Sequence, residues 1–338
     1  MKKLIVLCNE KVSVSEEQEF RCINADLQIL PDGLADFYDT ECIFRKSNII
    51  QNHKFKTKKI KISSNIFKFL LDLIQTFKFI DCRYLIITIT PYTFLSFLLL
   101  FTFKKKNIFV YLMSSGHEEW EHILGKWSVW IYDIMFKIIT SNSKVIVCHE
   151  RLFDKNKSYL VSPSRLEEVW HKNLETTPST DIPRFLYVGR INPEKGIINF
   201  IKIFENLNIE SELVIAGNNS DFKINNLKIK PLGYVLEEYN LIKAYDSCNM
   251  TILPSYTEAH PYVLEESLAR RRPVIIFEDI AYVKKNKFGV FICKRNKESL
   301  LKITQYILKN YESIQYEMKE NKLPLKKDMI DRFKKIIS

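Results

Sequence analysis

The stretch RFLYVGRINPEKGIINFIKIFENL, residues 184–207, decides the fold of this chain. Its opening RFLYV is a short, mostly apolar run and predicts a buried strand that ends at Gly189. The apolar-periodic run that opens after Gly196 predicts a helix. A strand that leads directly into a helix is the repeating unit of a parallel α/β sheet. Arg190 and Lys195 then stand at the carboxyl end of a strand beside a helix N-terminus, where they suit a diphosphate.

The same alternation of strand and helix continues on both sides of this stretch. Strands are expected at 3–8, 84–90, 108–113, 145–148 and 159–162 in the first half, and at 212–216, 250–253 and 274–277 in the second half, where helices are expected near 237–247 and 263–269. Residues 167–183 are polar, contain proline and lack periodicity, which is typical of a linker. The sequence therefore predicts an α/β protein with two doubly wound domains, 1–172 and 183–320. The Lys-rich amphipathic helix in 321–338 is expected to pack back on the first domain.

Residues 84–103 carry no charge and precede Lys104, Lys105 and Lys106, as a membrane-spanning helix would. The internal pattern favours another structure. Residues 84–90 are dominated by β-branched side chains, and Pro91 interrupts the run. We therefore expect a buried strand followed by a short helix.

A second motif lies at residues 251–275, TILPSYTEAHPYVLEESLARRRPVI. A strand ends near Ser255, a loop carries Glu258, and a helix that begins near Tyr262 carries Glu266. Carboxylates accept hydrogen bonds from the hydroxyls of sugars and of a ribose, and a helix N-terminus suits phosphate. Taken singly, Glu258 is equally typical of a solvated loop, and Glu266 of an acid placed early in a helix.

Together the two motifs resemble the retaining glycosyltransferases of family 4. In that family a strand ends in Gly-Arg and Pro-Glu-Lys-Gly follows, as at Gly189-Arg190 and residues 193–196 here. The family's two glutamates with seven residues between them match Glu258 and Glu266, and its Ala-x-x-x-Pro-Val matches residues 269–274. Strand-end glycines at Gly217 and in Leu232-Gly233-Tyr234 fall between the two motifs, so the resemblance covers residues 184–289.

The resemblance implies the GT-B fold, in which two Rossmann-like domains face each other across a cleft. It also implies a nucleotide-sugar donor, UDP- or GDP-linked, with no cofactor and no metal. The residues expected to bind the diphosphate are Gly189, Arg190 and Lys195. The residues expected to bind the sugar or the nucleotide are Glu258, Glu266, Gly217, Tyr234, Ala259, His260, Pro261, Tyr262, Val263 and Leu264, of which Glu258 is also taken as catalytic.

The chain departs from the family pattern at three places in this half. Ala259 and Arg271 stand where the family has glycine, and residues 278–281 replace a loop that contains Gly-Gly. In the first half the match is weaker. Relatives often place a histidine at the end of the strand predicted at 108–113. Here Ser115-Gly116 occupy that position, and His117, two residues on, is expected to line the cleft as a catalytic residue; the alternative is a capping or surface histidine.

The formal net charge of +11 predicts attraction to polyanions, although a Lys-rich composition is also typical of an AT-rich genome. The seven cysteines are scattered without metal or redox spacing, which indicates reduced thiols in a cytoplasmic protein. Aromatic and basic side chains gather in residues 68–79, 104–106 and 125–140. They suit an anionic membrane surface on the inner leaflet if exposed, or the core if buried.

We therefore expect a retaining, metal-independent glycosyltransferase of the hexosyltransferase type. Its expected acceptor is an oligosaccharide or a lipid-linked glycan of bacterial cell-surface polysaccharide, such as O-antigen or lipopolysaccharide. Nucleic acid is not the expected partner. The alternatives are a transferase that modifies DNA, or a binding protein on the same fold that holds a nucleotide without turnover.

Overall fold

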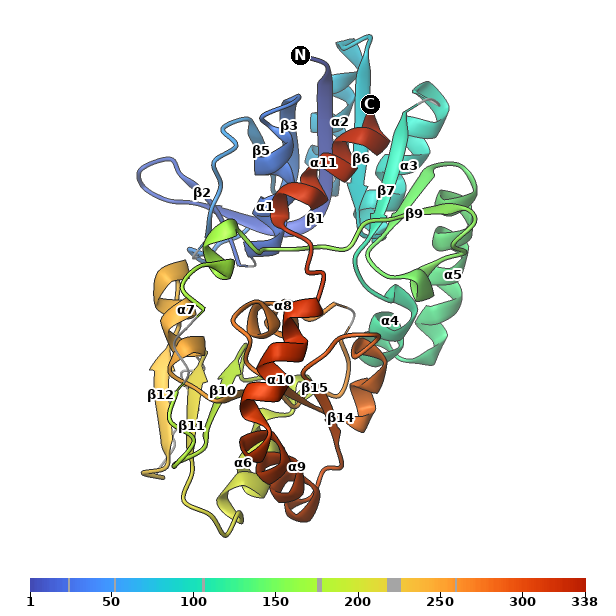
Figure 1. The fold of residues 1–338 in the computed structure, drawn as a ribbon. Coiled ribbons are helices and arrows are strands. Elements are labelled where there is room, and N and C mark those ends of the chain that lie inside the picture. Colours follow the sequence, from blue (N-terminus) through green and yellow to red (C-terminus); the bar gives the residue numbers. More distant parts are fainter. Residues whose placement is uncertain (24, 52, 105–106, 175–177, 218–225, 259) are drawn as a thin grey trace. The chain divides into compact units, whose positions relative to one another are not determined.

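The structure is a computed structural model that describes residues 1–338 except 24, 52, 105–106, 175–177, 218–225 and 259. The chain forms two compact units (Figure 1). The first unit comprises Met1–Arg165 and Lys326–Ser338, and the second comprises Leu166–Leu325. Each unit is a sheet with helices on both faces, because strands buried on both sides need a helical layer on each.

The sheet of the first unit has a parallel core that is extended by two short antiparallel strands. In sheet order the parallel strands are β5 (Ile60–Ser63), β3 (Asp39–Lys46), β1 (Lys3–Val14), β6 (Cys82–Ile87), β7 (Ile108–Leu112), β8 (Lys144–Val147) and β9 (Ser158–Leu160). The far end of β1 pairs with β2 (Phe20–Cys22), which pairs with β4 (His53–Lys54). The chain order along the sheet reverses between β1 and β6, as in doubly wound folds.

Two apolar clusters cover the two faces of this sheet. One contains residues of α1 (Ala25–Leu34) and α11 (Lys326–Ile337), and the other contains residues of α2 (Ile66–Ile74), α3 (Pro91–Phe103) and α5 (Lys126–Ser141). A further helix, α4 (Gly116–Leu124), follows β7. The last helix of the chain therefore belongs to the first unit. Buried Arg83 holds its end by donating to the carbonyl oxygens of Ile337 and Ser338.

The uncharged stretch 84–103 is a strand and a helix, as its pattern predicts. Strand β6 ends at Ile87, and α3 begins at Pro91 with a capping box between Thr90 and Thr93. No helix in the described part of the chain is long and apolar enough to cross a membrane.

The sheet of the second unit is parallel throughout the described strands. Its order is β12 (Ile229–Gly233), β11 (Glu212–Ala216), β10 (Arg184–Val188), β13 (Met250–Leu253), β14 (Val274–Phe277) and β15 (Val290–Cys293). The chain order reverses between β10 and β13, so the strand that opens the Gly-Arg motif and the strand that precedes Glu258 are neighbours. Ligands of doubly wound sheets bind at the carboxyl ends of the strands on either side of such a reversal.

Helices cover both faces of the second sheet. They are α6 (Ile197–Glu205), α7 (Glu238–Asp246), α8 (Tyr262–Ala269), α9 (Lys297–Lys309) and α10 (Tyr311–Glu317). The stretch predicted to be a linker differs from expectation at its start. Trp170 is buried in the same apolar cluster as α7, and Arg270 donates to the carbonyl oxygens of Trp170, Lys172 and Asn173. The beginning of this stretch therefore belongs to the second unit. The buried guanidinium of Arg270 needs hydrogen-bond acceptors, and the backbone of the stretch supplies them.

Candidate functional site

Lys195 and Glu258 meet at the carboxyl edge of the second sheet. Lys195 ends a short 3-10 turn, Pro193–Lys195, just before α6, and Glu258 lies on the loop between β13 and α8. The Nζ of Lys195 lies 2.7 Å from Oε1 of Glu258, and the Glu258 side chain is almost buried. Because β10 and β13 pair in register, motifs far apart in the sequence come together at one edge.

Glu258 is held by more than this ion pair. The hydroxyl of Ser255, a buried residue, donates to the same Oε1 at 2.6 Å. Both contacts converge on one carboxylate oxygen. The arrangement fixes the carboxylate while its second oxygen, Oε2, is engaged by neither of these two donors.

Two glycines allow the strand ends to approach this closely. A Cβ on Gly196 would lie 2.1 Å from the carbonyl oxygen of Pro254, and the φ of Gly196 is +65°. A Cβ on Gly217 would lie 2.0 Å from the carbonyl oxygen of Gly189. Backbone therefore packs on backbone here, and no side chain larger than hydrogen fits without a shift.

Arg190 is more exposed than Lys195. Its guanidinium lies 4.0 Å from Glu194, and the hydroxyl of Tyr187 donates to its carbonyl oxygen at 2.5 Å. Burial would raise the pKa of Glu194, but the hydrogen bond from Asn192 and nearby positive charge outweigh burial and hold that pKa below its usual value. Burial raises the pKa of Tyr187 above its ordinary value, so this hydroxyl stays a donor. The loop backbone is thus fixed while the Arg190 side chain reaches solvent.

Glu266 lies beneath the surface, only 3% exposed, on the second turn of α8. Its Oε2 accepts a hydrogen bond from the hydroxyl of Tyr245 at 2.8 Å. The ring of Tyr245 packs edge-on against Trp170. The sequence did not single out Tyr245 or Trp170, because apolar periodicity marks both simply as core positions.

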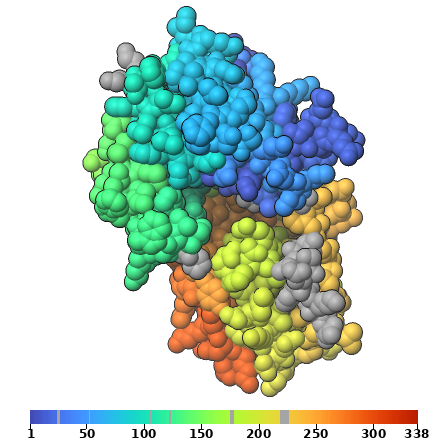
Figure 2. All heavy atoms as spheres, turned by 180° about the vertical axis from the view of Figure 1, so that it is seen from behind, coloured from blue at the N-terminus to red at the C-terminus, as the bar shows by residue number. Residues whose placement is uncertain are grey.

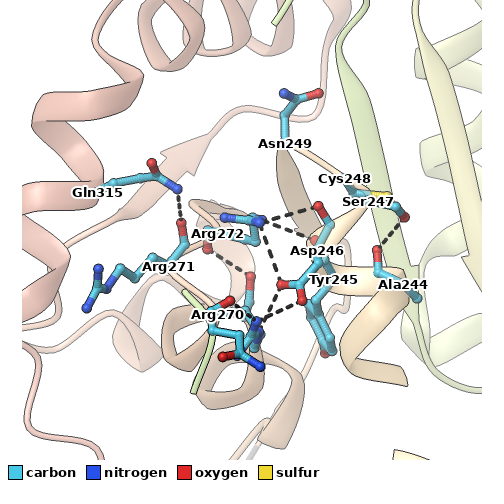
Figure 3. Close-up of polar contacts among 12 residues, drawn as sticks. Ala244, Tyr245, Asp246, Ser247, Cys248, Asn249, Arg270, Arg271, Arg272 and Gln315 are labelled. Carbon is cyan, nitrogen blue, oxygen red and sulfur yellow. Dashed lines mark hydrogen bonds and ion pairs between the residues drawn. The ribbon is translucent and has the colours of Figure 1, made fainter. Parts of the chain in front are cut away.

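Next to Tyr245, two buried arginines converge on Asp246 (Figure 3). Arg270 donates from Nε and Nη2 to the two carboxylate oxygens of Asp246, at 2.9 and 2.7 Å. Arg272 donates to the carbonyl oxygens of Tyr245 and Asp246. Burial lowers the pKa of Arg272 from its ordinary value. The network anchors the end of α7 to the end of α8, and so supports the helices that carry Tyr245 and Glu266.

The stretch 259–264 was expected to offer its backbone to a sugar. Ala259 lies outside the described residues. Pro261 has no amide hydrogen, and the amide of Leu264 donates to the carbonyl oxygen of Pro261 at 3.1 Å, so neither residue offers an amide to a ligand. The side chain of His260 turns inward, with Nε2 3.2 Å from Oε1 of buried Glu265.

Val263, Tyr262 and Tyr234 are the remaining predicted residues of the second unit. Tyr262 and Val263 form the first turn of α8, half-buried, and Val263 packs against the main apolar cluster. Tyr234 follows β12, two strands away from β10 in the sheet, and its side chain is exposed. The structure thus brings Gly189, Gly196, Gly217, Lys195 and Glu258 to one edge, and places Tyr234 further along it.

His117 lies in the first unit, on the first turn of α4. Its ring packs edge-on against Tyr132 and Phe136 of α5, and its Nε2 lies 3.7 Å from Asp133. These contacts fix the ring against α5 and explain its position by packing within the first unit. Among the described residues, no group of three or more His, Cys, Asp or Glu side chains is placed to hold a metal ion.

Two residues that the sequence did not single out contact the loop that carries Glu258. Tyr282 bonds to the backbone of Glu258, and Arg295 bonds to the carbonyl oxygen of Ser255. The signal that marks this region in the sequence is the replacement of the Gly-Gly loop at residues 278–281. That change shows that the loop differs but does not show which side chain compensates.

Comparison with known proteins identifies the second unit. Residues 170–322 match the family model described as "Glycosyl transferases group 1". A search of curated proteins finds no match to the chain.

Solved structures similar to the chain span nearly its whole length. Anabaena Alr3699/HepE in complex with UDP aligns with a TM-score of 0.72 and 11% identity over 99% of each chain. The lipopolysaccharide outer core galactosyltransferase WaaB, in its apo form, aligns with a TM-score of 0.67 and 14% identity over 99% of each chain. An alpha-glucosyltransferase in complex with UDP-glucose and DNA containing an abasic site aligns with a TM-score of 0.58 and 10% identity over 99% of each chain. At such identities the similarity establishes the fold, and the predicted GT-B fold is confirmed.

Proposed function

We propose that this chain, whose residues 170–322 belong to the group 1 glycosyl transferases, moves a sugar from a nucleoside-diphosphate sugar to a glycan or lipid-linked acceptor of bacterial cell-surface polysaccharide. The observation that carries the proposal is the pairing of Lys195 with Glu258 at the switch point of the second sheet. A cation for the leaving diphosphate and a carboxylate for the sugar hydroxyls stand side by side there.

The donor diphosphate is bound by Lys195 and Arg190 in this proposal. Cleavage of the bond between the anomeric carbon and the diphosphate builds negative charge on the leaving phosphate, and preorganised cations stabilise that charge. Lys195 is bonded to Glu258 before the donor arrives, so it is held in place and can extend one of its three N–H donors to phosphate. No metal ion and no further cofactor are required by this scheme, because the two side chains supply the positive charge.

The sugar and the ribose are bound by the two glutamates. Glu258 has Oε1 engaged by Lys195 and Ser255, and presents Oε2 to a sugar hydroxyl. Glu266, held by Tyr245, accepts from the ribose once the site opens to admit the nucleotide. We propose that transfer retains the anomeric configuration, as the resemblance to family 4 implies.

The acceptor class is supported by the kind of proteins that share the fold. WaaB and WaaG are described as glycosyltransferases of lipopolysaccharide, and both align over 99% of this chain. A hexose added to a lipid-linked glycan would place the enzyme at the cytoplasmic side of the inner membrane. The chain then works as a peripheral protein.

An exposed apolar face on the first unit supports this location. Helix α5 turns one face outward, and its exposed side chains follow the helical spacing i, i+3, i+4, i+7 and i+11: Trp127, Trp130, Ile131, Ile134 and Ile138. Trp127 and Trp130 are 67% and 70% exposed. Exposed tryptophans beside lysines are typical of side chains that rest at the boundary of a bilayer.

The face continues across the neighbouring helices. Helix α3 contacts both α2 and α5, and exposes Leu95, Leu98 and Phe103, while α2 exposes Phe67 and Leu71. Figure 2 shows the segments that carry these helices, sky-blue to green, at the surface on one side of the first unit. Each helix buries its other stripe in the core, so the same helices carry a core face and an exposed apolar face.

The first experiment is a panel of UDP-, GDP-, ADP- and dTDP-sugars incubated with the wild type, with Lys195→Ala and with Glu266→Ala. We expect release of one nucleotide from its sugar, abolished by both substitutions. If a nucleotide binds but no sugar donor is turned over, even with a range of glycan acceptors present, the chain is instead a binding protein on the same fold. Failure of every nucleotide to bind would exclude the donor site.

DNA is the competing acceptor, supported by the net charge of +11 and by the similar glucosyltransferase solved with DNA. Affinity for DNA through phosphate contacts falls steeply with salt. Retention on a DNA column that is lost between about 50 and 200 mM salt, together with transfer to DNA in the panel, would favour that acceptor.

A further inference from the structure

The loop that carries Glu258 is held in place by two side chains that lie outside the motifs shared with the family. We infer that Tyr282 and Arg295 are positioning residues, which set the place of the Glu258 carboxylate relative to the donor sugar. The inference rests on the proposed function. Neither residue is assigned contact with a substrate.

Tyr282 fixes the backbone of Glu258 with a single hydroxyl group. Its OH accepts from the amide of Glu258 at 3.1 Å and donates to the carbonyl oxygen of the same residue at 2.5 Å. Both backbone polar groups of Glu258 are therefore satisfied by one side chain. A hydroxyl that bonds to both the N–H and the C=O of one residue restrains the φ and ψ rotations about its Cα, and so restrains the direction of its side chain.

Tyr282 directly follows residues 278–281, which replace the family's Gly-Gly loop. These four residues and Tyr282 lie in one 3-10 turn, Glu278–Val283, directly after β14. Ile280 and Val283 of the turn are buried in the apolar cluster of the second unit, so the turn is anchored and the ring of Tyr282 packs against that cluster. An anchored turn can transmit a fixed position to the loop, as a glycine-rich one would not.

Arg295 holds the start of the same loop. Its Nη2 donates to the carbonyl oxygen of Ser255 at 3.0 Å, and its Nε donates to Asp279 of the same turn at 2.7 Å. The guanidinium also stacks on the rings of Tyr256 and Phe277, with its central carbon 4.0 and 4.4 Å from their centroids. A planar fork that both stacks and donates is specific to arginine.

Arg295 and Tyr282 together restrain the position of the Glu258 carboxylate. Arg295 fixes Ser255, whose hydroxyl bonds to the Glu258 carboxylate, and Tyr282 fixes the Glu258 backbone. Asp279, which binds Arg295, and Tyr282 lie on the same 3-10 turn. The start of the loop at Ser255 and its end at Glu258 are therefore both tied to this turn. The carboxylate is placed by these contacts before any donor binds, which is the preorganisation that transfer chemistry needs.

The decisive variant is Tyr282→Phe, which keeps the ring and removes only the hydroxyl. Hydrogen–deuterium exchange of the ligand-free protein reports directly on the amide of Glu258. We expect exchange in a peptide covering residues 255–260 to become about five- to tenfold faster, the ratio that follows from loss of one hydrogen bond. Tyr306→Phe, a change on an exposed tyrosine of α9, serves as the matched control and should leave this peptide unchanged.

Kinetics separate positioning from general stability. Whichever of UDP, GDP, ADP and dTDP the wild type binds is titrated into each variant, and turnover of the corresponding sugar donor is measured. Tyr282→Phe should leave the Kd of the free nucleotide unchanged and lower kcat about ten- to a hundredfold, because a small displacement of a reacting group is costly. Arg295→Lys, which keeps the charge but loses the fork, should show the same split to a smaller degree.

The outcomes are distinguishable from those of the proposed function. Unchanged exchange in Tyr282→Phe, or wild-type kcat in an enzyme that turns over its donor, would overturn the inference and leave the donor site standing. If wild type binds none of UDP, GDP, ADP and dTDP, the proposed function fails, while the exchange experiment still decides whether Tyr282 holds the loop. Weaker nucleotide binding in proportion to the loss of kcat would show a merely structural role and would also overturn the inference.

Discussion

Lys195 and Glu258 are 63 positions apart in the chain, and their side chains form an ion pair of 2.7 Å. The pair forms because β10 and β13 are neighbours in a parallel sheet whose carboxyl ends lie at the same edge. A pair so little exposed is not a typical surface salt bridge, since each partner gives up hydration to make it. Removing either partner leaves the charge of the other without its counter-charge in a largely buried place.

This relationship predicts the effect of Lys195→Ala on the reaction. Removing a preorganised cation from a developing phosphate charge should lower the turnover of the preferred sugar donor about a hundredfold or more. Nucleotide release is followed by a coupled assay. Lys202→Ala, which alters an exposed lysine of α6, the helix that follows the Lys195 turn, should retain wild-type turnover. Equal turnover in both variants would remove Lys195 from the site.

Two glycines of the second unit, Gly196 at the start of α6 and Gly233 at the end of β12, predict a difference between two similar substitutions. Gly196 and Gly233 have φ values of +65° and +69°, but a Cβ on Gly196 would meet the Pro254 carbonyl oxygen at 2.1 Å, and a Cβ on Gly233 would meet nothing within 4 Å. Gly233→Ala should lower the free energy of unfolding by about 1–2 kcal/mol, the cost of the left-handed backbone. Gly196→Ala should cost about 1–3 kcal/mol more, because of the steric overlap. Urea denaturation measures both, and equal losses would contradict the close approach of α6 to β13.

Arg271 predicts a stabilising change. It stands where the family has glycine, and its φ is +52°, which a side chain disfavours at the position following a helix end. Arg271→Gly should raise the free energy of unfolding by about 0.5–1 kcal/mol, since relief of strain exceeds the added freedom of the unfolded chain. Arg332→Gly, at an exposed position within α11, should instead lower the free energy of unfolding by about 1 kcal/mol. Thermal and urea unfolding give the signs, and destabilisation by Arg271→Gly would disprove the argument.

Glu41 predicts how the stability of the first unit depends on pH. Burial alone would raise its pKa, but Lys3 at 2.8 Å and Lys61 at 3.0 Å outweigh burial and hold the pKa below its ordinary value of 4.5. A carboxyl with a lowered pKa in the folded state stabilises the fold above the unfolded pKa, and this contribution is lost as the pH falls through the folded pKa.

The urea midpoint of the wild type should therefore fall as the pH is lowered from neutral to below 4.5. Glu41→Gln should be less stable than the wild type at neutral pH and should show a shallower fall. Glu118→Gln, which changes an exposed glutamate of α4, is the control and should follow the wild-type profile. Parallel profiles for wild type and Glu41→Gln would show that the pair with Lys3 adds no pH-dependent stability.

The apolar face of α5 predicts binding to membranes. The wild type should float with liposomes that contain anionic lipid, and less so as salt is raised, because insertion of tryptophan adds to attraction by lysines. Trp127→Ser with Trp130→Ser should abolish flotation while leaving the free energy of unfolding nearly unchanged, since both rings are exposed. Tyr306→Ser with Tyr316→Ser removes two exposed rings from the second unit and should float as the wild type does. Flotation by the double tryptophan variant would locate binding elsewhere.

Much of this protein follows from the sequence by itself. The two doubly wound sheets follow from the alternation of apolar strands and periodic helices, because burial on both faces leaves a continuous apolar signature at each strand. The Gly-Arg and Lys-Gly pairs at residues 189–196 can also be interpreted from local sequence. Glycine permits the sharp turn at a strand end, and a cation beside a helix N-terminus suits a phosphate group.

Only the tertiary structure decided which side chains meet. Tyr245 bonds to Glu266 across 21 residues, and Tyr282 bonds to Glu258 across 24, through a sheet order that local patterns do not encode. The sequence likewise does not predict which face of α5 is exposed, because periodicity marks the apolar stripes of a helix but not the stripe that packs on the sheet. Local backbone preferences are set by neighbours in the chain, whereas contacts between loops depend on how all the strands are ordered, and that order is a property of the whole packed sheet.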